Sequence, residues 1–254
     1  MDIKRVQNKL LEMASIIAEL LEEESISYML SYGTLLGAVR HNGFIPWDAD
    51  FDLMIFDDRY DDAISMLRTR LPKDMFLEDS KSEKKYFHAW AHVKDLNSVV
   101  ITRKETPDNV YEHKGITVDL YRGYRVKRKE LIDFQWEQNE KYLYRRKLAG
   151  TISDEEITKK REKKVAENKE LEKYIYESGK EEYVLALLMF YKCKFLEYTD
   201  IYPLKMYGFE DRFFYGPNNA GNILSAIYGN YLELPPKELR LPYMKEAIFY
   251  EVNN

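Results

Sequence analysis

Hydrophobic residues recur at helical spacing near the start of the chain, and short apolar runs follow. Val6, Leu10, Met13 and Ile17 would share one face of a helix, so an amphipathic helix is predicted over 4–24. The same reasoning predicts strand 26–30, helix 34–40, strand 53–56, helix 60–71, and strands 86–94, 98–102 and 116–121. Strands 86–94 and 98–102 are expected to pair around the turn at 95–97. Strands interleaved with helices predict an α+β fold, a mixed sheet flanked by helices.

The composition changes from about residue 125 onward. Residues 129–200 are rich in Lys, Glu and Tyr, with only Gly150 and Gly179, and two or three helices are predicted there. Ser153 and Glu156 have the spacing of a capping box, and the apolar run 184–191 is interpreted as a buried helix. We therefore expect a core domain at 1–125 and a mainly helical region at 126–254, packed on that core. The helices either simply cover the sheet or shape a binding site on it.

The overall composition is typical of a folded domain. The chain has 254 residues, 45% of them hydrophobic, and a net charge of −5. No apolar run reaches the roughly 18 residues that span a bilayer, and the start does not resemble a signal peptide. We expect a cytoplasmic protein, whether free or associated with the inner face of the membrane. The negative charge disfavours nucleic acid as a partner. With Cys193 as the single cysteine, neither an internal disulfide nor a Cys-based zinc site is expected.

Three aspartates at alternate positions, Asp48, Asp50 and Asp52, are the strongest chemical signal. Alternate side chains of a strand share one face, with backbones roughly 6–7 Å apart. That separation suits carboxylates converging on Mg²⁺, which leaves its other positions to water and substrate phosphates. The competing interpretation is an incidental acidic strand that faces water.

Residues 33–53, GTLLGAVRHNGFIPWDADFDL, closely resemble the signature of the LicD/fukutin-related family of phosphotransferases. Residues 114–121 and 209–236 resemble the second and C-terminal blocks of that family. The resemblance implies a nucleotidyltransferase-like fold with a Gly turn, an Asp-x-Asp pair and a third carboxylate on a neighbouring strand. Ala49 stands where the family commonly has Asp. We expect no loss of activity there, because that side chain would face away from the metal.

The resemblance also implies a set of site residues. The catalytic carboxylates would be Asp50, Asp52 and Asp119, and these three with Asp48 would bind Mg²⁺ or Mn²⁺. The expected substrate-binding residues are Gly33, Thr34, Arg40, His41, Trp47 and Lys94. His88 and His92 would share a strand face but lie ~13 Å apart, so they are not expected to bind one metal together.

The activity implied by the resemblance is transfer of phosphocholine from CDP-choline to a sugar hydroxyl, with release of CMP. The acceptor would be a cell-surface glycan or its lipid-linked precursor, such as teichoic acid or lipopolysaccharide. Trp47, Tyr228 and Tyr231 offer aromatic faces to a quaternary ammonium group. Two alternatives stay open: transfer of glycerol or ribitol phosphate from a CDP donor, and a catalytically silent nucleotide-binding scaffold. Three converging carboxylates beside a Gly turn argue against the silent scaffold, which has no physical need for them.

Overall fold

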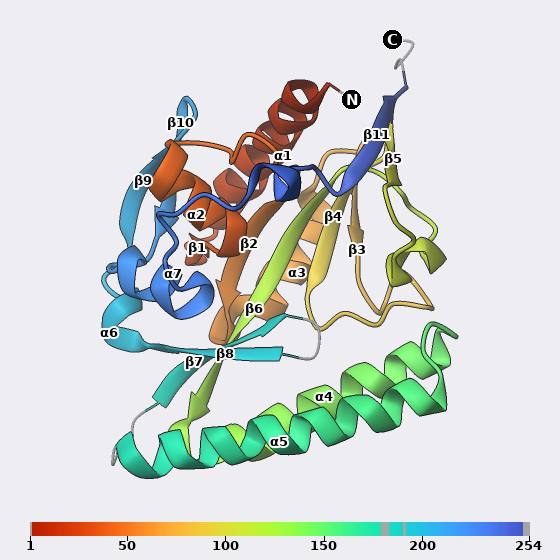
Figure 1. Ribbon diagram of the computed structural model, residues 1–254. Helices are drawn as coiled ribbons and strands as arrows, with labels where there is room; N and C mark the ends of the chain where they lie inside the picture. The colour runs from red at the N-terminus through yellow and green to blue at the C-terminus, as the bar shows by residue number, and fades with distance from the viewer. Residues whose placement is uncertain (1, 179–182, 190–191, 251–254) are drawn as a thin grey trace.

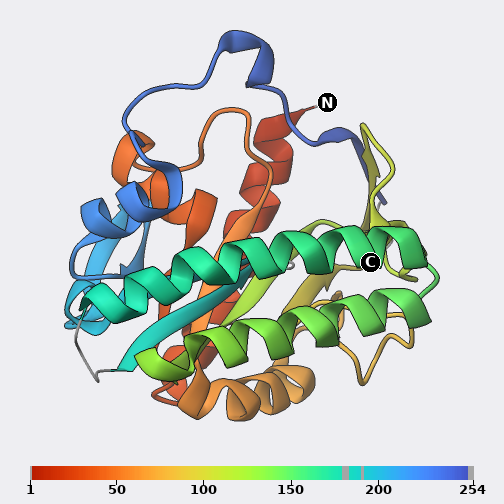
Figure 2. The ribbon, with the colours of Figure 1, turned by 60° about the horizontal axis from the view of Figure 1, so that its bottom comes forward.

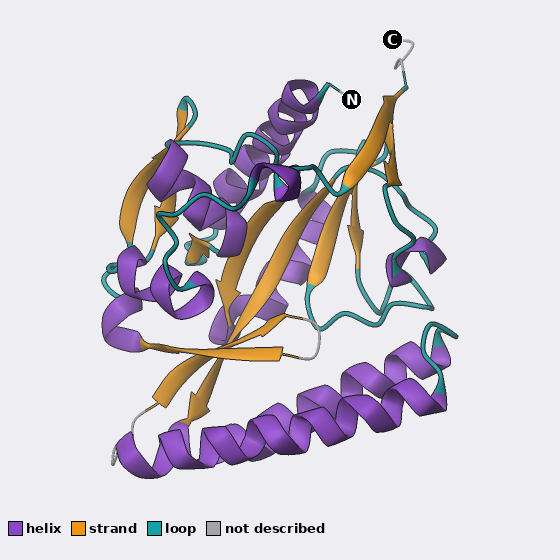
Figure 3. Ribbon diagram, in the orientation of Figure 1, coloured by secondary structure: helices purple, strands orange, loops and turns teal. Residues whose placement is uncertain are grey.

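A mixed sheet forms the centre of the molecule, and helices pack around it (Figures 1 and 3). The computed structural model describes residues 2–178, 183–189 and 192–250. The helices are α1 (Ile3–Glu23), α2 (Tyr32–His41), α3 (Asp57–Arg70), α4 (Leu131–Leu148), α5 (Asp154–Ser178), α6 (Tyr198–Ile201) and α7 (Ala220–Tyr228), with short 3-10 turns η1 (Pro107–Val110), η2 (Arg128–Glu130) and η3 (Lys237–Leu239). The strands are β1 (Tyr28–Leu30), β2 (Phe51–Phe56), β3 (Met75–Glu78), β4 (Ala91–Asp95), β5 (Ser98–Thr102), β6 (Thr117–Lys127), β7 (Tyr183–Met189), β8 (Lys192–Glu197), β9 (Lys205–Phe209), β10 (Arg212–Gly216) and β11 (Met244–Phe249).

The sheet has the order β1-β2-β6-β4-β3. Strands β2 and β6 are parallel, while β1, β4 and β3 each run antiparallel to their neighbours. The end of β6 continues past the other strands, and there β7 and then β8 add to it. This arrangement confirms the predicted mixed sheet flanked by helices. Because β6 runs from residue 117 to residue 127, the expected boundary at 125 falls inside one strand.

Helices α1 and α3 pack behind the central strands in the view of Figure 1. The apolar positions predicted for α1 are buried, Leu10 and Met13 completely, and the Asp2 side chain caps the helix by accepting from the Arg5 N–H. Burying such a side chain stabilises the fold by roughly 1.5–3 kcal/mol. Truncating Leu10 to Ala would cost about 2–5 kcal/mol, because a cavity adds to the lost transfer energy.

Helices α4 and α5 lie side by side as a long arm beneath the sheet (Figures 1 and 2). The predicted capping box at the start of α5 is confirmed: the Ser153 N–H donates to Glu156, and the Glu156 N–H donates to the Ser153 hydroxyl. Much of the contact between the helices is polar, as in the bond from Gln135 to Asn168. The arm is therefore held by hydrogen bonds as well as by apolar packing.

Three secondary-structure predictions were wrong. The strand expected over 86–94 forms only as β4, which begins at Ala91. Strand β5 does not pair with β4; it pairs with β11 near the other end of the chain, while β4 lies between β3 and β6. The apolar run expected as a helix over 184–191 forms strand β7 through residue 189, and residues 190 and 191 lie outside the described part. Residues 184–187 of that run are buried as expected, but an eight-residue apolar run fits a buried strand as well as a helix. Its partner is the free end of β6.

Within the described residues, none of the helices has the length and apolar character required to cross a membrane. The C-terminal part from residue 126 contains helices α4–α7 and also the five strands β7–β11. The segment that joins α7 to β11, residues 229–243, crosses in front of the sheet in Figure 1. We call it the C-terminal strap.

Candidate active site

A cavity of about 530 Å³ opens over one face of the sheet. Its wall combines acidic, basic and aromatic side chains from α2, β2, β4, β6, the η1 region and the strap. The acidic side chains on the wall are Asp48, Asp50, Asp52, Asp108 and Asp119; the basic and imidazole ones are Lys94, Lys114, His88, His92 and His113; and the aromatic ones are Tyr32, Trp90, Tyr121, Tyr228 and Tyr243. This mixture is typical of a site for a charged, partly apolar ligand.

Four ionisable side chains form a row straight across the sheet. Asp52 of β2 is the register partner of Asp119 of β6, which is the partner of His92 of β4, which in turn is the partner of Glu78 of β3. Register partners project from the same face of a sheet. The row therefore brings together residues 14 to 67 positions apart in sequence on one rigid surface.

The aspartates of the motif meet at the start of β2. This strand begins at Phe51, so Asp52 lies on it, while Asp48 and Asp50 precede it in a loop. The prediction that Asp50 and Asp52 hold alternate positions of one strand was wrong, because Asp50 precedes β2, although all three aspartates line the same cavity. Phe51, the apolar residue between them, is fully buried and anchors the strand as expected.

Gly33 and Thr34 give the acidic cluster its place against α2. A Cβ on Gly33 would lie 2.9 Å from Asp48 Oδ2 and 3.7 Å from Asp52 Oδ2, so glycine leaves room for both carboxylates. The hydroxyl of Thr34 accepts a 2.8 Å hydrogen bond from the Asp52 N–H and is buried. The N-terminus of α2 thus faces the carboxylates, and its partial positive charge stabilises negative charge there.

The carboxylates hold protons more tightly than free aspartates do. Burial raises the pKa of Asp48 to about 6 and that of Asp119 to about 7. Burial also raises the pKa values of Asp50 and Asp52 well above the ordinary range, and the neighbouring acids add to that rise. Like charges that are gathered away from water repel each other, so a bound cation would relieve this strain.

The donor set fits a hard divalent cation in its chemistry, because Mg²⁺ and Mn²⁺ prefer carboxylate oxygens. Across residues 2–178, 183–189 and 192–250, however, no three His, Cys, Asp or Glu side chains stand in an arrangement that would hold a metal ion. Binding one would therefore require these carboxylates to move closer together. Asp48 accepts from the Ala49 N–H at 2.9 Å, and Asp50 is bonded to the hydroxyl of Tyr243 on the strap.

The opposite side of the cavity is basic and aromatic. Lys94 is buried, donates to the Thr117 hydroxyl at 3.0 Å, and lies 3.6 Å from Glu78 Oε2. Lys114 donates to three backbone carbonyls, those of Asp108, Asn109 and Tyr111, and so fixes the η1 region. The cavity thus has an acidic side beside α2 and a cationic side around Lys94.

Four of the expected substrate-binding residues do not line the cavity: Thr34, which is buried beneath it, and Arg40, His41 and Trp47. Arg40 donates to the backbone carbonyls of Tyr231 at 2.7 Å and of Glu233 at 3.3 Å, which holds the strap. The ring of His41 packs edge-on against Trp47, and the Arg240 guanidinium lies over the Trp47 ring. Their assignment as substrate ligands stays a prediction, and their contacts give them a structural task.

The two histidines are much closer together than the sequence suggested. Their ring centroids are 5.0 Å apart rather than ~13 Å, because residues 87–90 form a bend instead of a strand. The hydroxyl of Tyr86 donates to the Trp90 carbonyl at 2.7 Å and closes that bend. The expected separation of His88 and His92 was therefore wrong, and both line the cavity.

Several site residues were missed from sequence. Glu78, Asp108 and Tyr243 carry no motif, and only the folded sheet and strap bring them near the aspartates. His92 did leave a signal, since it alternates with Lys94 on a strand that neighbours Asp119. Tyr228 was singled out as an aromatic candidate and does line the cavity.

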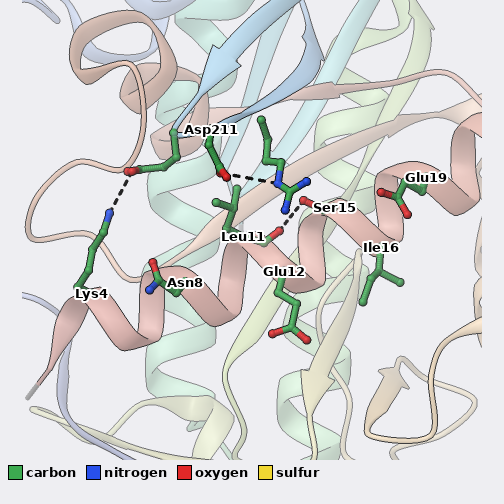
Figure 4. Close-up of a pocket in the computed structure, with 10 residues that line it drawn as sticks. Lys4, Asn8, Leu11, Glu12, Ser15, Ile16, Glu19 and Asp211 are labelled. Carbon is green, nitrogen blue, oxygen red and sulfur yellow. Dashed lines mark hydrogen bonds and ion pairs between the residues drawn. The ribbon is translucent and has the colours of Figure 1, made fainter.

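A second hollow, of about 560 Å³, lies between α1 and the β9–β10 turn (Figure 4). Its charged side chains pair with each other at the surface, as Lys4 does with Glu210 at 3.0 Å. The view shows surface side chains such as Glu12 and Glu19 around an open groove. We place the chemistry in the cavity over the sheet, where the buried carboxylates gather.

A mixed sheet with clustered carboxylates beside a helix N-terminus defines a nucleotidyltransferase-like class of domain. Residues 25–144 match the family described as LicD/FKTN/FKRP, nucleotidyltransferase domain. This range contains α2, β2, β3, β4 and β6 and therefore the whole ionisable row. The resemblance seen in the sequence is confirmed as a match to this family over residues 25–144, just under half of the chain.

The individual relatives match this chain either over a short stretch or at low sequence identity. Lipopolysaccharide cholinephosphotransferase LicD of Haemophilus influenzae is 56% identical over 41 residues, 16% of this chain and 16% of that protein. An uncharacterised protein of Rickettsia prowazekii is 25% identical over 230 residues, 89% of this chain and 58% of that protein. Ribitol 5-phosphate transferase FKRP of Homo sapiens is 47% identical over 45 residues, 18% of this chain and 9% of that protein. The chain thus matches less than two thirds of the length of each relative.

Proposed function

We propose that this protein is a metal-dependent phosphotransferase that moves phosphocholine from CDP-choline to a sugar hydroxyl of a cell-surface glycan or its lipid-linked precursor. The observation that carries the proposal is the gathering of Asp48, Asp50, Asp52 and Asp119 in one cavity opposite Lys94. Phosphoryl transfer needs in-line positioning and neutralisation of the charge on the transferring group. Four carboxylates on a cavity wall are suited to hold the cation that phosphates require.

In this proposal each charged group has a task. Asp50 and Asp52, with Asp48, hold Mg²⁺ or Mn²⁺, and the cation when bound neutralises charge on the donor diphosphate. Lys94 contacts a donor phosphate from the opposite side. Asp119 is either a further ligand or the base that takes the acceptor proton, and its raised pKa of about 7 suits proton transfer near neutral pH.

The reaction then balances as a single displacement. The acceptor oxygen forms a bond to the phosphorus that carries the alcohol, and the bond from that phosphorus to the oxygen of the CMP phosphate breaks. CMP leaves with the electron pair, and the proton of the acceptor hydroxyl passes to the base. The transferred group keeps its own P–O–C bond, so phosphocholine moves intact.

The aromatic wall supports choline over a polyol. Tyr228, Tyr243 and Trp90 line the cavity together with carboxylates, and aromatic faces with nearby negative charge suit a quaternary ammonium group. Glycerol and ribitol phosphate are the alternative cargoes, since a named ribitol 5-phosphate transferase is among the relatives. A polyol would instead require polar donors around its hydroxyls.

The test is a donor panel. Purified protein is incubated with Mg²⁺ and CDP-choline, CDP-glycerol, CDP-ribitol or CDP-ethanolamine, with and without a glycan acceptor, and CMP release is measured. We expect acceptor-dependent release with CDP-choline that EDTA abolishes. Release with only a polyol donor would replace choline in the proposal. No release with any donor, while CDP-choline still binds, would support the silent scaffold instead.

A further inference from the structure

We propose that His92, held from behind by Glu78, is a positioning residue that fixes the carboxylate of Asp119 for the reaction. The proposal rests on the proposed function of the cavity. Imidazole Nδ1 of His92 lies 3.1 Å from Glu78 Oε2, and Nε2 lies 3.2 Å from Asp119 Oδ1. One ring thus bridges two carboxylates, of which one is deep in the sheet and the other faces the cavity.

Asp119 is held at both of its oxygens. Oδ1 faces His92, and Oδ2 accepts from the Tyr121 hydroxyl at 3.5 Å. The Trp90 indole is close enough to favour the charged form of this carboxylate. These neighbours come from β4, β6 and the segment before β4. Contacts from side chains on separate parts of the fold favour one orientation of the Asp119 carboxylate.

Burying the Glu78 carboxylate costs free energy, which indicates that this bridge does more than stabilise the fold. Its side chain is 1% exposed, Oε1 has no hydrogen-bond partner among the described residues, and Oε2 is shared by His92 and, at 3.6 Å, Lys94. A buried ionic group is often no more stabilising than an apolar residue of the same size. A sheet position that needed only packing would be filled better by leucine. A role in orienting His92 explains why this position carries glutamate.

The register of the sheet makes the bridge rigid. Glu78, His92 and Asp119 are direct partners on three adjacent hydrogen-bonded strands. Partners that stand behind a ligand or catalytic group typically change metal affinity or activity by 10- to 100-fold when they are removed. We expect an effect of that size on Asp119 chemistry from loss of the imidazole.

The main variant is His92→Phe, which keeps a ring but removes both nitrogens. We expect kcat for CMP release to fall about 10- to 100-fold with little change in the donor KM, because Asp119 loses its orientation rather than the donor its contacts. His92→Gln, whose amide still donates toward Asp119, should restore part of that kcat. Glu78→Gln keeps the shape and an acceptor oxygen, and its effect should be smaller than that of His92→Phe.

A matched control separates positioning from simple loss of stability. The Tyr60 hydroxyl donates to the Leu120 carbonyl and accepts from the Ala91 N–H, next to Asp119 and His92 in the same two strands but without touching the Asp119 carboxylate. Tyr60→Phe removes buried hydrogen bonds there and should lower the melting temperature without altering kcat. If His92→Phe lowers only the melting temperature, as the control does, the positioning role is overturned.

Mn²⁺ binding, measured by electron paramagnetic resonance without substrate, gives a second readout. Weaker Mn²⁺ binding by His92→Phe supports positioning of a ligand, while unchanged binding with reduced kcat supports positioning of a base. Unchanged Mn²⁺ binding together with wild-type kcat in His92→Phe would refute the proposal and leave the transferase function intact. If the wild type transfers nothing from any donor, the proposed transferase function is wrong. Weaker Mn²⁺ binding by His92→Phe than by wild type would then still support the bridge. Equal Mn²⁺ binding would overturn it.

Discussion

Residues 48–52 and residues 40–47 belong to one sequence motif, yet they face different parts of the molecule. Asp48, Asp50 and Asp52 line the cavity, while Arg40 bonds the carbonyls of the C-terminal strap and Trp47 packs between His41 and Arg240. One region carries charge toward a ligand, and the other holds a distant segment in place. A family signature can therefore combine chemistry with architecture, and its residues need separate tests.

The largest effect is expected in the acidic region. Asp50→Asn or Asp52→Asn keeps the shape but removes a charge, and turnover should fall on the order of 10²-fold or more, by analogy with loss of one preorganised stabilising group. The melting temperature should hold or rise, since repulsion among buried acids is relieved. Steady-state CMP release and thermal melts measure both. Asp211→Asn, at an exposed acid, is the control. Wild-type turnover in Asp50→Asn would refute the catalytic interpretation.

Asp119→Asn should also abolish transfer, and calorimetry of the donor separates its two possible tasks. If Asp119 acts only as the base, the variant binds Mg²⁺–CDP-choline with nearly normal affinity. If it is a ligand, donor affinity falls together with turnover. A variant that keeps full transfer would remove Asp119 from the reaction.

An intermediate effect is expected at Gly33→Ala. The added Cβ would come within 2.9 Å of Asp48 Oδ2, so that carboxylate must move. Because it is the end of a side chain that moves, the fold should survive, and turnover should fall about tenfold, as for a misplaced reacting group. Rates at several Mg²⁺ concentrations provide the measurement. An unchanged Mg²⁺ dependence would show that Asp48 is not part of the metal site.

Arg40→Lys probes the architectural region directly. One guanidinium nitrogen of Arg40 makes both bonds to the strap, and the lysine ammonium ends one atom short of it. We therefore expect a loss of about 1–2 kcal/mol in unfolding free energy and little change in the donor KM. Urea unfolding and donor titration give the two numbers. Arg59→Lys, at an exposed ion pair, controls for the substitution itself. A raised donor KM without loss of stability would instead make Arg40 a phosphate ligand.

The smallest effect concerns pH. The pKa values of Asp48 and Asp119 are raised in the fold, to about 6 and about 7. The folded state then binds more protons than the unfolded state. Without divalent metal, the unfolding free energy of the protein therefore falls as pH rises from about 4 to about 7. The melting temperature of Asp119→Asn, relative to wild type, should rise across that window. A constant difference would show that Asp119 titrates normally.

The acidic half of the site could be predicted because its residues are neighbours in sequence. Asp48, Asp50 and Asp52 lie within five residues, and the family resemblance implied that Asp119 lies on a neighbouring strand, where the structure has it. The other half of the row depends on which strands pair. Glu78 joins His92 only through the register of β3 with β4, and local patterns do not encode such a register.

The wrong predictions have the same physical origin. Residues 184–189 are apolar throughout, which identifies burial but not the partner, and the free end of β6 made them a strand. Strand β5 pairs with β11, which lies more than 140 residues later. The bend at 87–90 depends on the hydroxyl of one tyrosine, Tyr86. Each outcome was decided by a tertiary contact.

Glu210, at the turn between β9 and β10, contacts two distant segments at once. Its carboxylate accepts from Lys4 and from the Phe44 N–H, which are 206 and 166 positions away in sequence, and its own N–H donates to the Asn42 carbonyl. At roughly 5–20 residues per second, a ribosome makes residue 210 on the order of ten to thirty seconds after Phe44. The loop that leads to the aspartates therefore gains its hydrogen bonds to Glu210 only late in translation. A nascent chain completes the cavity no earlier than that.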